Sequence, residues 1–132
     1  IVTGGERWKP MLEEFVAAQG LAARLASVRT VAPTGADIAR NPKAAMALLA
    51  RGCSACARED GADVVILGGA GLAGLAAKLR TAVDVPLLDG VACAISMAEA
   101  LAKQKPCRAG TPPAPVASVG LSKGLAKLIG SP

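Results

Sequence analysis

Four short apolar runs, rich in β-branched residues, alternate along the chain with helical patterns. The runs are the predicted strands, and they lie at residues 1–3, 25–31, 64–67 and 85–88. Apolar residues recur at helical spacing over residues 10–20, 43–59, 71–82, 90–103 and 121–129. This alternation predicts an α/β fold with a parallel four-stranded sheet and helices on both faces. We expect the third run to be a central strand buried on both faces, and the fourth to lie at a sheet edge or to begin at Pro86.

Three of the predicted strands end in turns that contain glycine. In parallel sheets, ligands bind beyond the carboxyl ends of the strands. Glycine lets a ligand approach the backbone closely, and the start of the next helix offers N–H groups to an anion. A carboxylate, an imide oxygen or a phosphate fits that chemistry. The candidate binding residues in these turns are Thr3, Gly4, Gly5, Gly69, Ala70 and Gly71.

The composition excludes several classes of function. The chain has no histidine, so it holds no Ser-His-Asp or Cys-His nucleophile and no histidine metal ligand. Aromatic residues make up only 2%, which argues against base-stacking surfaces. The net charge of +5 comes from scattered single Lys and Arg residues, so no nucleic-acid partner is expected. No apolar run approaches the roughly 18 residues of a membrane span, so no membrane partner is expected either.

Four cysteines are present: Cys53, Cys56, Cys93 and Cys107. The first two form a C-x-x-C pair, but inside a helical pattern rather than at the strand-to-helix turn of a redox motif. The last two do not complete a zinc site, so no metal is expected. We therefore expect a reduced, cytoplasmic protein whose cysteines act as small hydrophobic side chains.

The turn after the third strand contains a full G-x-G-x-x-G match, Gly69-Ala70-Gly71-Leu72-Ala73-Gly74. Asp89 follows Gly69 by 20 residues, at the end of the next predicted strand. This spacing is typical of a dinucleotide-binding module, which is one functional hypothesis. The match falls in the third strand–helix unit instead of the first, which weakens it. A purely structural interpretation is that the glycines let a helix start close to a central strand.

A longer pattern resembles another family. It consists of residues 2–12 (VTGGERWKPML), 61–72 (GADVVILGGAGL) and 85–92 (VPLLDGVA), with a tail at residues 117–123 (ASVGLSK). Together these segments resemble the second half of aspartate/glutamate/hydantoin racemase superfamily proteins, in particular the hydantoin and allantoin racemase branch. The resemblance covers nearly the whole chain. No single motif is specific, but their order and spacing together are.

The resemblance implies a fold of two similar α/β domains that face each other across a cleft. It also implies cofactor-independent inversion at a carbon next to a carbonyl group. One cysteine from each domain flanks that carbon, so that one thiolate removes the proton and the other thiol returns it from the opposite face. Backbone amides and small hydroxyls hold the carboxylate or imide oxygens and the developing enolate.

The sequence departs from this pattern in its catalytic residue. The family's second-domain cysteine follows the Leu-Gly pair after the central strand, and here Leu67-Gly68 is followed by Gly69. Cys93, in the predicted helix after Asp89, does not match the motif. A single cysteine in the other half would still support one-base chemistry, such as decarboxylation or one-sided exchange, and the superfamily includes decarboxylases that use one cysteine.

The chain is expected to supply residues 1–104 as one racemase-like α/β domain. Residues 105–132 are expected to form a proline-rich tail and a short helix that pack on a missing N-terminal domain. The first strand begins in mid-run at Ile1, which suggests a fragment. We expect such a fragment to be inactive alone. The expected substrate of the racemase-like protein is a small carboxylate or imide, and the sequence leaves open whether the protein forms a homo-oligomer. A divergent, non-catalytic domain that keeps a small-anion pocket is a third hypothesis.

Overall fold

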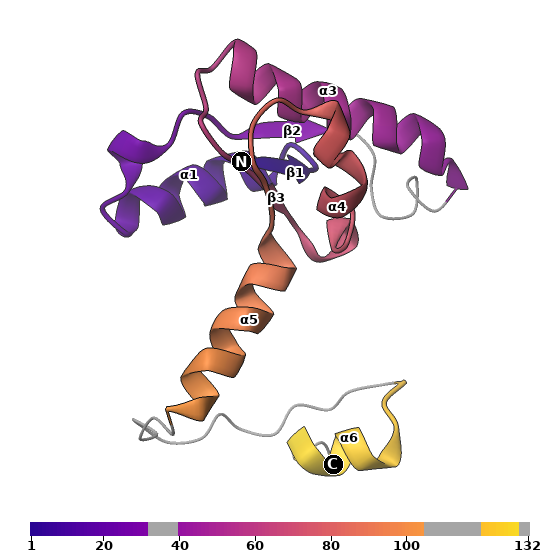
Figure 1. Ribbon diagram of the computed structural model, residues 1–132. Coiled ribbons are helices and arrows are strands. Elements are labelled where there is room, and N and C mark those ends of the chain that lie inside the picture. The colour runs from indigo at the N-terminus through magenta and orange to yellow at the C-terminus, as the bar shows by residue number, and fades with distance from the viewer. Residues whose placement is uncertain (32–39, 105–119, 130–132) are drawn as a thin grey trace.

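The protein forms a four-stranded parallel sheet with strand order β2-β1-β3-β4 (Figure 1). The computed structural model describes residues 1–31, 40–104 and 120–129. The strands are β1 (Val2–Gly4), β2 (Arg29–Val31), β3 (Val65–Gly68) and β4 (Leu87–Asp89). The α-helices are α1 (Trp8–Ala18), α3 (Pro42–Arg58), α4 (Ala76–Leu79), α5 (Gly90–Lys103) and α6 (Lys123–Ile129). Short 3₁₀ turns are η1 (Ala22–Arg24), η2 (Ala70–Leu72) and η3 (Arg80–Ala82).

All three strand pairs are parallel, as the alternation of elements predicts. In the central pair, Val2 of β1 lies opposite Leu67 of β3; in the outer pair, Leu67 lies opposite Asp89 of β4. The carboxyl ends of β1, β3 and β4 therefore meet at one edge of the sheet. As expected from Pro86, β4 is an edge strand, and the carbonyl of Pro86 accepts a hydrogen bond from Val65 N.

The core lies between the sheet and α3. Asn41 begins this helix, because its side chain accepts a hydrogen bond from Ala44 N and Pro42 occupies the first turn. The helix runs along one face of the sheet (Figure 1). It buries one stripe of small and branched side chains against β1, β2 and β3. Its buried members are Ala45, Leu49, Cys53 and Cys56. The predicted role of the two cysteines as buried hydrophobic side chains is confirmed, and both are free thiols.

The opposite face of the sheet is only partly covered. Ile66 of β3 and Leu88 of β4 share this face and are 39% and 42% exposed. The prediction that the third run is buried on both faces is therefore wrong: its residues alternate between buried and exposed. The physical reason is that α5, which follows β4, extends away from the sheet instead of folding back over it (Figure 1).

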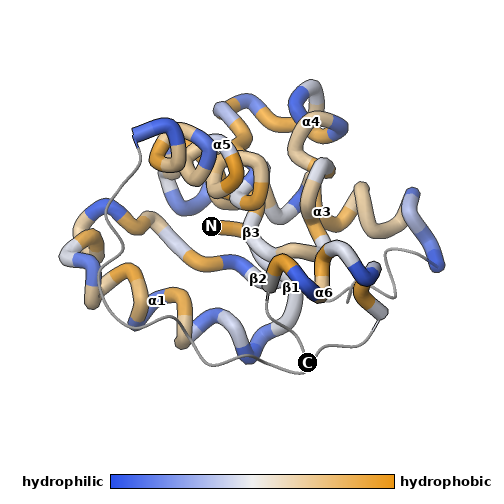
Figure 2. The backbone as a smooth tube through the Cα atoms, turned by 90° about the horizontal axis from the view of Figure 1, so that it is seen from below, coloured by the Kyte–Doolittle hydropathy of each residue, from blue (hydrophilic) through white to orange (hydrophobic). Residues whose placement is uncertain are grey.

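Two helices on this side of the molecule also carry exposed apolar residues. Neither α1 nor α5 has a buried residue, and Figure 2 shows hydrophobic stretches along both. The large exposed side chains on them are Trp8, Met11, Phe15, Ile95, Met97 and Leu101. No helix in the described residues is both long enough and apolar enough to span a membrane.

Two further predictions differ from the structure. The expected helix over residues 71–82 is broken into η2, α4 and η3, with Gly74 at a φ of +78° between the first two. The expected strand at residues 25–31 contains only the three residues of β2, and Leu25 ends the 3₁₀ turn η1 instead of beginning a strand. The predicted terminal helix is confirmed over Lys123–Ile129, with Ser122 Oγ accepting from Leu125 N, while the proline-rich segment lies outside the described residues.

A polar cluster ties β2 to the end of α3. The Arg29 guanidinium donates to both carboxylate oxygens of Asp60, at 2.6 and 2.7 Å, and to Glu59 at 2.8 Å. Ser27 Oγ donates to Asp60 Oδ2 at 2.5 Å. The guanidinium first, and then the hydroxyl, hold the pKa of the Asp60 carboxyl well below its usual range.

This cluster predicts how stability depends on pH. Because the folded-state pKa of Asp60 is lowered, its contribution to the free energy of unfolding is present above the ordinary aspartate pKa of about 4. It is lost progressively as the pH falls below that value toward the lower folded-state pKa. Asp60→Asn should therefore flatten the change in unfolding free energy between pH 7 and pH 3, measured by urea denaturation. Asp63→Asn is the matched control, since Asp63 is exposed and forms no ion pair within the described residues. Parallel pH curves for the wild type and Asp60→Asn would contradict this.

Candidate functional site

The turns after β1, β3 and β4 meet at the carboxyl edge of the sheet. Thr3 lies opposite Gly68 in the register of β1 and β3, so the turns that follow these strands begin side by side. Thr3 is only 6% exposed, whereas the residues from Gly69 to Gly71 are exposed. The structure therefore brings Thr3 and the glycine turn together, as the sequence predicts.

Gly69 has a backbone conformation that only glycine adopts readily. Its φ is +115° and its ψ is 137°, a region in which a Cβ atom is strained. A Cβ built on Gly69 would lie 3.6 Å from Thr3 Oγ1, an ordinary contact distance. The obstacle to a side chain here is therefore the backbone angle, not a lack of space. The backbone at residue 69 is therefore adapted to glycine.

The turn after Gly69 is closed by local hydrogen bonds. Leu72 N donates to Gly69 O at 3.0 Å, and Ala73 N donates to Ala70 O at 3.3 Å. Leu72 N is the first donor in the turn, so the N–H groups of Ala70 and Gly71, which come before it, have no acceptor within the turn. These two amides and the Thr3 hydroxyl are the polar groups that this edge offers to a small ligand.

The turn after β1 uses its backbone groups differently. Gly4 pairs with Val31 in the sheet, and Gly5 N donates to Val31 O at 3.3 Å. The carbonyl of Gly5 accepts from Trp8 N at 3.1 Å, which begins α1. The amide of Gly5 is therefore engaged within the protein. Of the candidates in this turn, Thr3 is the residue that faces Gly69.

Asp89 joins two of the turns at this edge. One carboxylate oxygen accepts from Val91 N and Ala92 N, at 3.1 and 3.0 Å, and caps α5. The other accepts from Gly74 N at 2.6 Å. These backbone donors, Ala92 first, lower the pKa of the Asp89 carboxyl. Asp-Gly before a helical pattern is a recognisable signal for the cap on α5. Sequence reasoning missed the bond to Gly74, for which no local pattern gives a signal.

The dinucleotide hypothesis requires two features that the structure lacks. First, the G-x-G-x-x-G segment should open a helix, but it leads into η2, and the next α-helix, α4, has four residues and begins at Ala76. Second, the acidic residue at the end of the next strand should be free to bind a ribose. The Asp89 carboxylate instead accepts three backbone hydrogen bonds within the protein.

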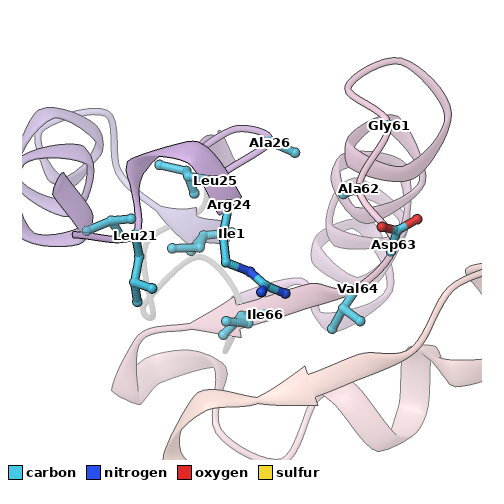
Figure 3. A pocket seen from close by; sticks show the side chains of 11 residues that line it. Ile1, Leu21, Arg24, Leu25, Ala26, Gly61, Ala62, Asp63, Val64 and Ile66 are labelled. Carbon is cyan, nitrogen blue, oxygen red and sulfur yellow. The ribbon is translucent and has the colours of Figure 1, made fainter. Parts of the chain in front are cut away.

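Two hollows in the described surface lie away from the candidate edge. The first, of about 350 Å³, lies near the amino ends of the strands, where Arg24 of η1, Asp63 and Ile66 are among the residues that line it (Figure 3). The second, of about 370 Å³, lies beside Arg29 and Asp60. None of the six candidate binding residues lines either hollow. On this chain, the candidate site is a set of exposed turns at a sheet edge.

The cysteines do not supply a thiol at Gly69. Cys53 and Cys56 are fully buried in the core, and burial raises the pKa of the Cys53 thiol to about 11. Cys93 is exposed on α5, and Cys107 lies outside the described residues. Within the part of the chain that the structure describes, no group of three or more Cys, Asp or Glu residues could hold a metal ion.

The fold and the site define a parallel α/β domain whose candidate ligand edge is made of backbone turns and one hydroxyl group. Residues 1–98 match the Asp/Glu/hydantoin racemase family. The chain belongs to this family, and the resemblance seen in its sequence is confirmed.

Individual relatives agree with this assignment. The chain is 34% identical to the hydantoin racemase of Pseudomonas sp. (strain NS671) over 101 residues, which are 76% of this chain and 41% of the relative. It is also 34% identical to the hydantoin racemase of Rhizobium meliloti, covering 76% of this chain and 42% of that one. The crystal structure of allantoin racemase from Pseudomonas fluorescens superimposes with a TM-score of 0.76 at 33% identity, over 90% of this chain and 52% of that chain. The chain therefore spans about half the length of these relatives, or less.

The conformation of Gly69 leads to a prediction about stability. Gly69→Ala should lower the free energy of unfolding by about 1–3 kcal/mol, because its φ of +115° is strained for any residue with a Cβ. Gly71→Ala is the control, since Gly71 lies in the same turn and its φ is not positive. Urea denaturation of both variants measures the difference. Equal losses at the two positions would contradict the conformation described for Gly69.

Proposed function

We propose that this chain is one half of a racemase-like protein that binds a small imide or carboxylate at the Thr3–Gly69 edge, and that it does not invert the substrate by itself. The observation that carries the proposal is the φ of +115° at Gly69, which disfavours any side chain there. We propose that Gly69 stands at the position of the family's second cysteine, because it follows the pair Leu67-Gly68. Membership in the racemase family supports the substrate class, since the relatives are named for hydantoin and allantoin.

Inversion of a carbon next to a carbonyl group needs two proton-transfer groups, one on each face of the carbon. The first removes the proton, negative charge develops on the carbonyl oxygen, and the second returns a proton from the opposite side. Gly69 has no side chain that can take either role. We therefore assign this half to binding: the Thr3 hydroxyl and the amides of Ala70 and Gly71 hold the carbonyl or carboxylate oxygens.

A facing domain would supply the remaining chemistry. With a single thiolate there, the proposed site supports one-sided reactions, in which the same thiol removes and returns the proton, or decarboxylation. We propose that residues 1–104 are the domain that presents the edge and that residues 105–132 reach the other half. The partly covered sheet face and the exposed apolar residues of α1 and α5 are consistent with a chain that packs against further protein.

The proposal predicts what the isolated chain does with a substrate. In D₂O, the chain alone should leave the optical rotation of a single enantiomer of 5-methylhydantoin unchanged relative to buffer. Its C5–H should likewise exchange no faster than in buffer, because no described side chain at the Thr3–Gly69 edge transfers a proton. Polarimetry and ¹H NMR measure the two rates, with a buffer-only sample as the control. Enzymatic racemisation by the isolated chain would contradict the assignment.

Binding is tested separately from turnover. Hydantoin should perturb the amide chemical shifts of Thr3, Gly69, Ala70 and Gly71 in a ¹⁵N spectrum of the same chain. Perturbation by NAD along the side of Asp89, with none by hydantoin, would favour the dinucleotide hypothesis instead.

A further inference from the structure

The glycine loop, residues 69–74, is held mostly by bonds within itself. Its own turn bonds, from Leu72 N to Gly69 O and from Ala73 N to Ala70 O, shape the loop but do not orient it on the sheet. Leu72 is buried and anchors the middle of the loop, whereas the rest of the loop is exposed. Any further orientation must come from contacts with neighbouring elements.

The turn from Asp89 to Gly90 provides such contacts at both ends of the loop. At its far end, the Asp89 carboxylate accepts from Gly74 N at 2.6 Å, across 15 residues of sequence. At its near end, Gly90 packs closely on the strand that enters the loop: a Cβ on Gly90 would lie 3.3 Å from Leu67 O and 3.8 Å from Gly68 Cα. One short turn therefore touches the backbone just before the loop and at its last residue.

We propose that Asp89 is a positioning residue: through its bond to Gly74 it holds the glycine loop in the orientation that a ligand at the Thr3–Gly69 edge meets. The ligand part of this inference rests on the proposed function, whereas the orientation of the loop does not. The two carboxylate oxygens have separate partners, since one caps α5 and the other accepts from Gly74. A carboxylate is suited to this task because both of its oxygens accept hydrogen bonds.

Asp89→Asn separates these two roles. The amide oxygen of Asn can still accept from Val91 N and Ala92 N, whereas its NH₂ group cannot accept from Gly74 N. Hydrogen exchange at Gly74 should therefore become about tenfold faster or more, while exchange at Val91 and Ala92 changes much less. The amide shifts of Gly69 and Ala70 should move as well. Unchanged exchange at Gly74 would overturn the proposal.

The matched control is Asp84→Asn. Asp84 lies just before β4 and forms an exposed ion pair with Arg58, so its replacement should leave exchange at Gly74 unchanged. Equal acceleration at Gly74 in both variants would mean a general loosening of the fold and would overturn the proposal. If Asp89→Asn does not fold, hydrogen exchange in the wild type tests the bond to Gly74 instead. Gly74 N should exchange about tenfold or more slowly than Gly61 N, an exposed glycine amide with no hydrogen bond within the described residues.

Titration with hydantoin links the loop to the ligand. Asp89→Asn should weaken hydantoin binding by about tenfold relative to the wild type, and Asp84→Asn should not. Undiminished binding by a variant whose loop exchange has accelerated would overturn the link between loop orientation and ligand. If the wild type itself does not bind hydantoin, the proposed function fails, and the exchange data still decide whether Asp89 orients the loop.

Discussion

The packing of α3 against β1, β2 and β3 is the contact on which the rest of the structure depends. Most of the fully buried side chains lie in this layer, among them Val2, Leu49 and Val65. Each such side chain contributes roughly 1.5–3 kcal/mol on burial. Close approach is possible because Gly52 faces β2, where a Cβ would lie only 3.1 Å from Val31 Cγ1. This layer fixes the strands in parallel register, and the register places their three turns at one edge.

The chemistry available at that edge is mostly backbone chemistry. The Thr3 hydroxyl lies beside Gly69, 3.6 Å from where a Cβ would stand, and Gly69 adopts a φ that disfavours a side chain there. The charged residue nearby, Asp89, is directed at amides of its own chain. An edge built in this way is suited to holding an oxygen atom of a ligand, and proton transfer needs a group that the described edge does not contain.

The two faces of the sheet differ in how far helices cover them. The α3 face is closed and carries the core. The other face leaves Ile66 and Leu88 partly exposed, and α5 extends from it with no residue buried. A parallel sheet is usually covered on both faces, because its central strands are apolar on both. The face with Ile66 and Leu88 departs from this rule, because it is only partly covered. The chain spans about half the length of its relatives, or less.

Local patterns in the sequence were sufficient to predict the order of strands and helices and the parallel sheet, because these features depend on the periodicity of neighbouring residues. The racemase family was predicted differently, from the resemblance of several segments to that family. Three features depended on the tertiary structure: the exposure of Ile66, the positive φ of Gly69, and the bond between Asp89 and Gly74. Exposure depends on whether another element covers the sheet. The φ of Gly69 depends on the path of the backbone through the turn, which residue types alone do not specify. The bond between Asp89 and Gly74 joins segments 15 residues apart, so a G-x-G-x-x-G motif followed by an aspartate suggested a ribose ligand where the folded chain forms an internal hydrogen bond.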